Sequence, residues 1–120
     1  MDRYAISFTV REGTEDKVAE ILASYPPPKH RVDDETRLVS TSVFMHGTQV
    51  VRMLEIEGNL FSALAHLAKD PSIQAVERQV SPYLVEERDL DDPDGARAFF
   101  AKALMRHVTT RYAAPVTEGV

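Results

Sequence analysis

Hydrophobic and polar residues alternate along three segments of the chain, which is the pattern of half-buried β-strands. In residues 3–10, one face carries four large apolar side chains: Tyr4, Ile6, Phe8 and Val10. Residues 37–44 and 49–57 alternate in the same way, and the residues between them, 45–48, have the composition of a turn. We therefore expect these two later segments to pair as a β-hairpin.

Apolar residues at helical spacing mark four further segments, each with a recognisable beginning. Residues 15–25 follow the capping hydroxyl of Thr14 and stop at three consecutive prolines. Asn59 is placed to cap a second helix, and Asp70-Pro71 to end it and start a shorter third one. A last helix is expected after Asp92-Pro93, where an apolar stripe follows: Phe99, Phe100, Ala103 and Leu104.

The order of these elements predicts the fold class. We expect a fourth strand at residues 83–87, directly after Pro82. The order strand, helix, strand, strand, helix, strand is that of a ferredoxin-like α+β fold, βαββαβ, here with an extra C-terminal helix. Residues 1–108 are expected to form this single domain, and residues 109–120, which lack periodicity, to form a flexible tail.

The predicted hairpin is apolar on both faces, which points to an assembly. Val50, Leu54 and Ile56 lie on one face, and Val51 and Met53 on the other. Two helices can cover only one face of the sheet, so another surface must cover the second. A symmetric partner sheet would do so and give a homodimeric α+β barrel. Alternatively, the C-terminal helix folds across the open face.

The composition excludes several classes of chemistry. The chain has no cysteine, which excludes disulfides, thiolate nucleophiles and cysteine-bound metals. Its net charge of −5, with 14 scattered basic residues, argues against nucleic acid as a partner. No apolar run is long enough to span a membrane and no secretory leader is present, so we expect a cytoplasmic protein. The expected partner is an uncharged or anionic small molecule.

Arg52 is the polar residue that most needs an explanation, because it lies between Val50 and Leu54 on an apolar strand face. A buried guanidinium requires a partner. That partner is either a structural carboxylate, from the same strand or from the 33–35 loop, or a carbonyl or enolate oxygen of a substrate. Thr41 should lie beside Arg52 on the neighbouring strand, either as part of a site or simply as a residue that favours strands.

Two further residues could transfer protons. His30 lies in the polar loop before the second strand, and Tyr25 at the end of the first helix, although an exposed loop position for His30 and a core position for Tyr25 explain them without a site role. His66 falls opposite the apolar stripe of its helix and should face solvent, and Glu86–Asp94 should be a solvated connector. No phosphate loop, dinucleotide fingerprint, metal-binding histidine pair or nucleophile elbow occurs, so we expect no cofactor and no metal.

Several segments resemble the SchA/CurD-like domain family, and the resemblance covers residues 3–105. The segments that carry it are Thr36-Arg37-Leu38, 41–45, 50–52, 55–58, 83–90 and 98–100. The family is known from bacterial aromatic polyketide and spore-pigment pathways. It is more distantly similar to the tetracenomycin-type polyketide cyclases and the cofactor-free antibiotic-biosynthesis monooxygenases, both of which are dimeric ferredoxin-like α+β barrels.

The resemblance implies a homodimeric protein that tailors an aromatic polyketide intermediate, with polyketide synthase components as further partners. As a cyclase, it would stabilise an enolate with Arg52 and orient carbonyls with Arg37, Thr41 and Tyr83. The two proton-transfer residues named above would complete the site. The alternatives are a cofactor-independent monooxygenase that forms a quinone from a phenol or anthrone, and a subunit that binds the polyketide without catalysis. The acid–base residues of the cyclases have no match here and are not transferred.

Overall fold

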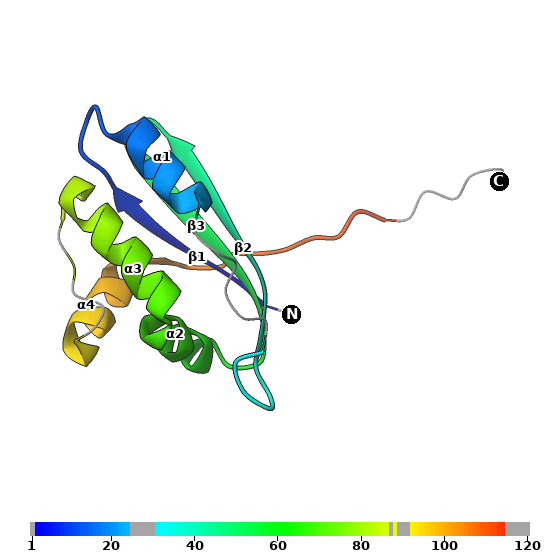
Figure 1. Cartoon of the computed structure of the whole chain (residues 1–120). Coiled ribbons are helices and arrows are strands. Elements are labelled where there is room, and N and C mark those ends of the chain that lie inside the picture. Colours follow the sequence, from blue (N-terminus) through cyan, green and yellow to red (C-terminus); the bar gives the residue numbers. More distant parts are fainter. Residues whose placement is uncertain (1, 25–30, 87, 89–91, 115–120) are drawn as a thin grey trace.

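A four-stranded antiparallel sheet and four α-helices make up the part of the chain that the structure, a computed structural model, describes: residues 2–24, 31–86, 88 and 92–114. In chain order the elements are β1 (Asp2–Thr9), α1 (Glu15–Ser24), β2 (Arg37–His46), β3 (Gln49–Glu57), α2 (Leu60–Lys69), α3 (Pro71–Val80), the 3-10 turn η1 (Ser81–Tyr83), α4 (Pro93–Ala103) and β4 (Leu104–Met105) (Figure 1).

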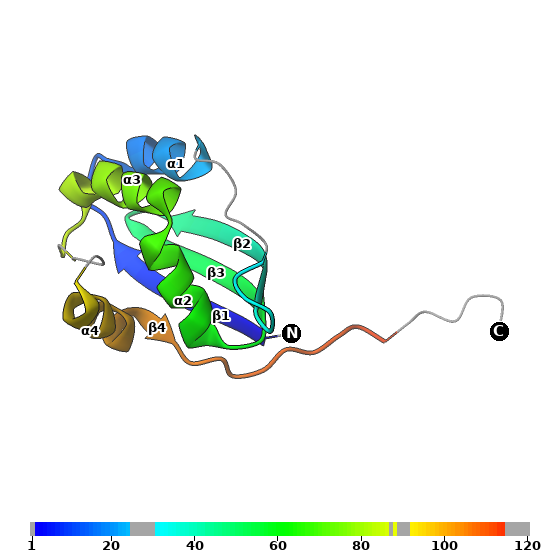
Figure 2. The same cartoon turned by 60° about the horizontal axis from the view of Figure 1, so that its bottom comes forward.

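The strands lie in the order β2-β3-β1-β4, and each neighbouring pair is antiparallel. Strands β1 and β2 are therefore parallel, and α1 connects them across the face of β3. Helices α1, α2 and α3 lie on the same face of the sheet (Figure 2). This arrangement is a ferredoxin-like α+β fold, so the predicted fold class is confirmed.

Side-chain caps begin three of the helices at the predicted positions. Asn59 accepts a hydrogen bond from the backbone N–H of Ser62 at 3.0 Å, and Asp70 accepts one from Ser72 at 2.8 Å. Asp92 accepts from Gly95 in the same way before α4. Because Asp70 both ends α2 and caps α3, the chain changes direction there, and the two helices cover different parts of the sheet.

The predicted fourth strand at residues 83–87 is wrong. Pro82 stands inside the 3-10 turn η1, and the chain beyond it touches the sheet only through the isolated bridge between Leu84 and Val10. Glu87 lies outside the described residues. The edge position beside β1 is instead taken by β4, which pairs with Ala5 and Ile6 after the chain has passed through α4.

The helix-facing side of the sheet carries two separate clusters of buried apolar residues. The first cluster lies beneath α1 and α3 and includes Val50 of β3. The second cluster lies beneath α2 and includes Leu54 and Ile56 of the same strand. Arg52 stands between Val50 and Leu54, and its partner on β1 is Ile6, which belongs to neither cluster. The core is thus divided along the row that contains Arg52.

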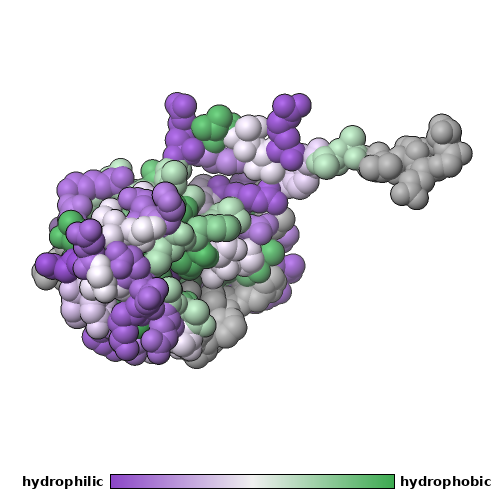
Figure 3. All heavy atoms as spheres, turned by 90° about the horizontal axis from the view of Figure 1, so that it is seen from above, coloured by the Kyte–Doolittle hydropathy of each residue, from purple (hydrophilic) through white to green (hydrophobic). Residues whose placement is uncertain are grey.

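The opposite face of the sheet, the open face, is not covered by any helix of the described residues, although the C-terminal segment reaches it at Arg3. Helix α4 lies beside the β1 edge, and its Phe100 packs against the second cluster on the helix side, so the alternative in which α4 crosses the open face is wrong. On the open face Phe44 is 59% exposed and Met105 47%, while Val51 and Met53 are partly buried. In the space-filling view, hydrophobic side chains gather beside the C-terminal segment, which projects from the body (Figure 3).

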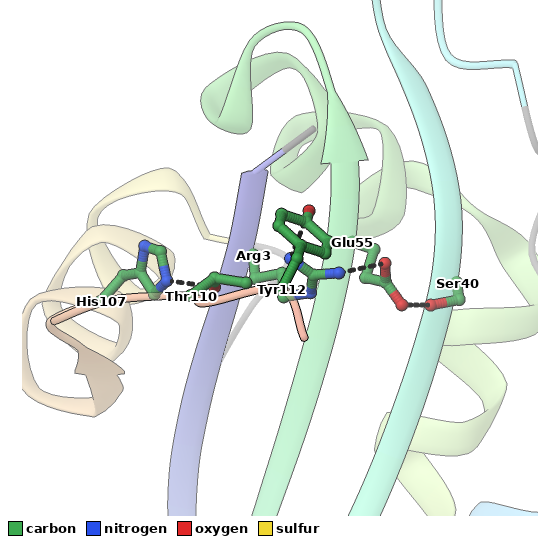
Figure 4. A network of polar contacts seen from close by, with 6 residues as sticks. All are labelled: Arg3, Ser40, Glu55, His107, Thr110 and Tyr112. Atoms are coloured by element: carbon green, nitrogen blue, oxygen red, sulfur yellow. Dashed lines mark hydrogen bonds and ion pairs between the residues drawn. The ribbon is translucent and has the colours of Figure 1, made fainter. Parts of the chain in front are cut away.

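One end of the open face carries a row of polar contacts that reaches the C-terminal segment (Figure 4). Arg3 of β1 donates to the hydroxyl of Tyr112 at 3.2 Å and lies 3.5 Å from Glu55 of β3. Ser40 of β2 donates to the other oxygen of the Glu55 carboxylate at 2.9 Å. Glu55 is therefore engaged on the face opposite to that of Arg52.

Gly58 joins β3 to α2 in a conformation that other residues rarely adopt. Its φ is +107°, and a Cβ there would overlap the carbonyl oxygen of Glu35 and lie 2.8 Å from the Cα of Thr36. Thr36 is buried, and its hydroxyl accepts a hydrogen bond from the N–H of Asn59. The 33–36 loop therefore packs directly against the turn that starts α2.

We expect Gly58→Ala to lower the free energy of unfolding by about 2–4 kcal/mol, because backbone strain and overpacking add. Gly13→Ala is the matched control, since Gly13 has a φ of +87° but nothing within 4 Å of an added Cβ. The free energy of unfolding of Gly13→Ala should fall only by the cost of the backbone strain, about 1–2 kcal/mol. Urea unfolding of both variants measures the difference, and equal losses would contradict this account.

Candidate functional site

A hollow of about 180 Å³ lies between the sheet and the helices, beside the row that divides the core. Arg52 and Thr41 line it from the sheet, and α3 contributes Gln74 and Glu77. Most of the remaining wall is apolar, and α2 and α4 contribute part of it. A cavity of about 150 Å³ is enough to hold a benzene ring, so this hollow has room for about one ring.

The strand register brings Arg52 and Thr41 together as predicted. Arg52 pairs with Val43 across the hairpin and Thr41 pairs with Leu54, so Thr41 is the diagonal neighbour of Arg52 on the helix-facing side. Both side chains are partly buried and line the same hollow. A guanidinium and a hydroxyl are thereby presented to one small space.

Asp33, one of the three carboxylates of the 33–35 loop that could have partnered Arg52, has other hydrogen bonds. Asp33 accepts from the backbone N–H groups of Glu35 and Thr36, at 2.8 and 2.7 Å. The hydrogen bond from Glu35 is the main reason why the pKa of Asp33 lies below its ordinary value. Like Glu55 on the open face, Asp33 serves local structure rather than the site.

Arg88 provides a second guanidinium that lines the hollow. It makes two hydrogen bonds to the carboxylate of Glu77, at 2.9 and 3.1 Å, and only 6% of its side chain is exposed. The Phe8 and Phe99 rings lie on it, with centroids 4.6 and 4.1 Å from its Cζ atom. Its Nη1 atom is buried and has no hydrogen-bond partner among the described residues. Among the described residues, Arg88 thus keeps one N–H donor group that no acceptor satisfies.

Sequence reasoning missed Arg88, since Glu86–Asp94 was expected to be a solvated connector. That expectation is wrong at Arg88. The residues that bury it come from β1, α3 and α4, so no local pattern reveals it. The one available signal was a basic residue, Arg88, within an otherwise acidic stretch, together with a carboxylate on a predicted helix, Glu77.

Two other predicted site residues, Arg37 and Tyr83, do not join Arg52 and Thr41 in the hollow. Arg37 is exposed at the start of β2, where it pairs with Glu57. Tyr83 packs against the first cluster. Tyr25 and His30 lie outside the described residues. The expectation that His66 faces solvent is wrong, because it is partly buried and its Nε2 atom is screened from water.

Two kinds of feature are absent from the described residues. Histidine and acidic side chains nowhere gather in a group of three that could hold a metal ion. Among the same residues, no helix combines the length and the apolar character that a membrane crossing requires.

Comparison with known proteins assigns the family. Residues 1–113 match the SchA/CurD-like domain. The chain belongs to this family. Over 103 residues it is 55% identical to a protein named polyketide synthase CurD from Streptomyces cyaneus, and the match covers 86% of this chain and 28% of that protein. The chain therefore spans little more than a quarter of the length of each of these curated relatives.

Solved structures share the fold at low sequence identity. L-rhamnose mutarotase FA22100 from Formosa agariphila is 13% identical with a TM-score of 0.59, covering 93% of this chain and 100% of that one. Tetracenomycin F2 cyclase from Streptomyces glaucescens, a type-II polyketide cyclase, is 15% identical with a TM-score of 0.56, covering 96% and 100%. At such identities the likeness concerns the fold alone.

We expect the Glu77–Arg88 pair to behave as a buried ion pair. Glu77→Leu should lower the free energy of unfolding by about 3–5 kcal/mol, because it leaves the Arg88 charge buried without its carboxylate. The double variant Glu77→Leu/Arg88→Met removes both charges and should be more stable than Glu77→Leu alone. Chemical unfolding of the wild type, Glu77→Leu, Arg88→Met and the double variant tests this. A double variant that loses the sum of the two single losses would show that the pair is not coupled.

Proposed function

We propose that this domain binds an aromatic polyketide intermediate in the hollow and folds it for an intramolecular aldol cyclisation. The observation that carries the proposal is the lining, in which Arg52 and Arg88 are set into a mostly apolar wall. Cations in a partly dehydrated space favour a ligand that develops negative charge on oxygen. The name of the CurD relative, a polyketide synthase, supports the same class of substrate.

The proposed reaction needs only a base, groups that stabilise an oxyanion, and a shape that holds the chain folded. A base removes a proton from the carbon between two carbonyl groups, and the resulting enolate carbon attacks a third carbonyl of the same chain. Arg52 and the Nη1 atom of Arg88 would stabilise the enolate and the alkoxide that follows, and the hydroxyl of Thr41 would orient a carbonyl. The apolar wall would limit the conformations of the chain, which supplies part of the rate. His30 or Tyr25 remains the proposed proton-transfer residue.

Cyclisation is tested by incubating the protein with a minimal polyketide synthase and identifying the products. Arg52→Met should lower the rate of cyclised product formation by about 100-fold, because it removes a preorganised oxyanion partner. Arg31→Met, which changes an exposed loop arginine, should leave the rate unchanged. An unchanged product spectrum with and without the wild-type protein would overturn the proposal.

The same assay separates the alternatives. Cyclisation proceeds without dioxygen, so full conversion under anaerobic conditions is expected. A strict requirement for dioxygen would instead favour the cofactor-independent oxygenase, in which the bound anion itself reduces dioxygen. If Arg52→Met weakened binding but changed no chemical step, the protein would be a non-catalytic binding subunit.

We further propose that the domain forms a homodimer through the open face of the sheet. Phe44, Met105, Met53 and Val51 place apolar side chains on that face, and no helix of the described residues covers it. A contiguous apolar surface of this kind is seldom left in water by a monomer. Two copies that meet face to face would bury it symmetrically.

Met53→Glu should split this dimer or precipitate the protein, because it places a charge in the centre of the apolar surface. Ala19→Glu, on the exposed side of α1, introduces the same charge away from the sheet and should change neither mass nor solubility. Light scattering over a concentration series measures the mass of all three proteins. A monomeric wild type would contradict the proposed dimer.

A further inference from the structure

The hollow is too small for the ligand that the proposed function requires. At about 180 Å³ it holds about one ring. Pockets for small molecules usually measure about 300–1,000 Å³. A poly-β-carbonyl chain or a fused-ring intermediate must therefore extend beyond the hollow, and the surrounding surface determines where it can go.

An apolar groove adjoins the hollow. It measures about 640 Å³ and runs between α2 and α4. Leu64, Ala68, Gln74 and Phe100 line both spaces, so the groove and the hollow share a wall. Phe61 lines the outer part of the groove and is 77% exposed, which is unusual for a residue of this size.

We propose that this α2–α4 groove is a second subsite, which holds the apolar, multi-ring remainder of the ligand whose oxygen-rich end lies in the hollow. The inference rests on the proposed function for the identity of the ligand. Arg52 and Arg88 would bind the anionic end, and the side chains of the groove would cover the faces of the remaining rings. The domain would therefore select elongated aromatic ligands over single-ring ones.

Two observations favour a small molecule over a protein partner in the groove. The groove shares a wall with the charged hollow, whereas a surface built for a protein partner has no need of a charged recess beside it. The groove is lined by α2 and α4, and α2 lies on the helix side of the sheet (Figure 2), so a dimer through the open face would leave the groove accessible. Lys69 and Arg97 line it as well and add positive charge beside the apolar wall, in keeping with an anionic ligand.

The test compares two carboxylate probes, benzoate and anthracene-2-carboxylate, whose affinities are measured by isothermal titration calorimetry. The wild-type protein should bind the three-ring probe at least about tenfold more tightly, a difference of about 1.4 kcal/mol. Ala101→Trp fills the groove from the exposed side of α4 and should abolish this preference without weakening benzoate binding.

Ala98→Trp is the matched control. Ala98 is also exposed on α4, but it lines a hollow of about 430 Å³ at the β1 edge, which shares Arg88 and Phe99 with the first hollow and no residue with the groove. It should keep the preference for the three-ring probe. Circular dichroism and the melting temperature confirm that both variants are folded.

Three outcomes would overturn the second subsite: equal affinity of the wild type for both probes, a preference that survives in Ala101→Trp, or a preference lost only in Ala98→Trp. A change in the mass of Ala101→Trp by light scattering would assign the groove to a contact between copies and also overturn it. Failure of the proposed function is distinguishable, because the expected binding pattern would then persist while no cyclised product forms.

Discussion

An arginine in the middle of an apolar strand face is the constraint on which the arrangement of this domain depends. Val50 and Leu54, two residues away on either side, are almost completely buried beneath the helices. Arg52 cannot be buried among them in the same way, because removing a guanidinium from water costs several kcal/mol unless polar groups replace the water. The core is consequently built as two clusters, and the space between them is the hollow.

The helices are arranged according to the same two clusters. The chain breaks between α2 and α3 at Asp70, so one helix covers the second cluster and the other helps to cover the first. Glu77 of α3 then holds Arg88 against the wall of the hollow. Among the described residues that line the hollow, three arginines, Arg52, Arg78 and Arg88, outnumber the one carboxylate, Glu77, and a low local dielectric strengthens their effect on a bound oxygen.

Features encoded by neighbouring residues could be predicted, and features that depend on distant residues could not. Three strands and the capped helices follow from alternation and from Asn59, Asp70 and Asp92, so their positions were predicted closely. Strand β4 has only two residues and therefore no periodicity to detect. The segment at 83–87 has strand-forming residues, but Pro82 starts a 3-10 turn before it, and only Leu84 forms a bridge to β1.

The site residues also fall into those that could be predicted from neighbouring residues and one that could not. Arg52 and Thr41 were predicted as neighbours because both lie on strands whose register follows from the hairpin. Arg88 became buried through contacts with Phe8 and Phe99, which lie about 80 residues before it and 11 residues after it in the printed sequence. Burial by aromatic rings is a tertiary effect, and no local preference of arginine reports it.

The fold by itself does not select the chemistry, since a sugar mutarotase and a polyketide cyclase both share it at similar TM-scores. The side chains around the hollow discriminate better. A sugar carries hydroxyl groups on most of its carbons, and each one that loses water needs a hydrogen-bonding partner. Here the polar groups line the hollow, from the sheet and from α3, while the adjoining groove is largely apolar. Such an environment would leave most sugar hydroxyls unsatisfied, whereas a flat aromatic ligand with its oxygens at one end would match both parts.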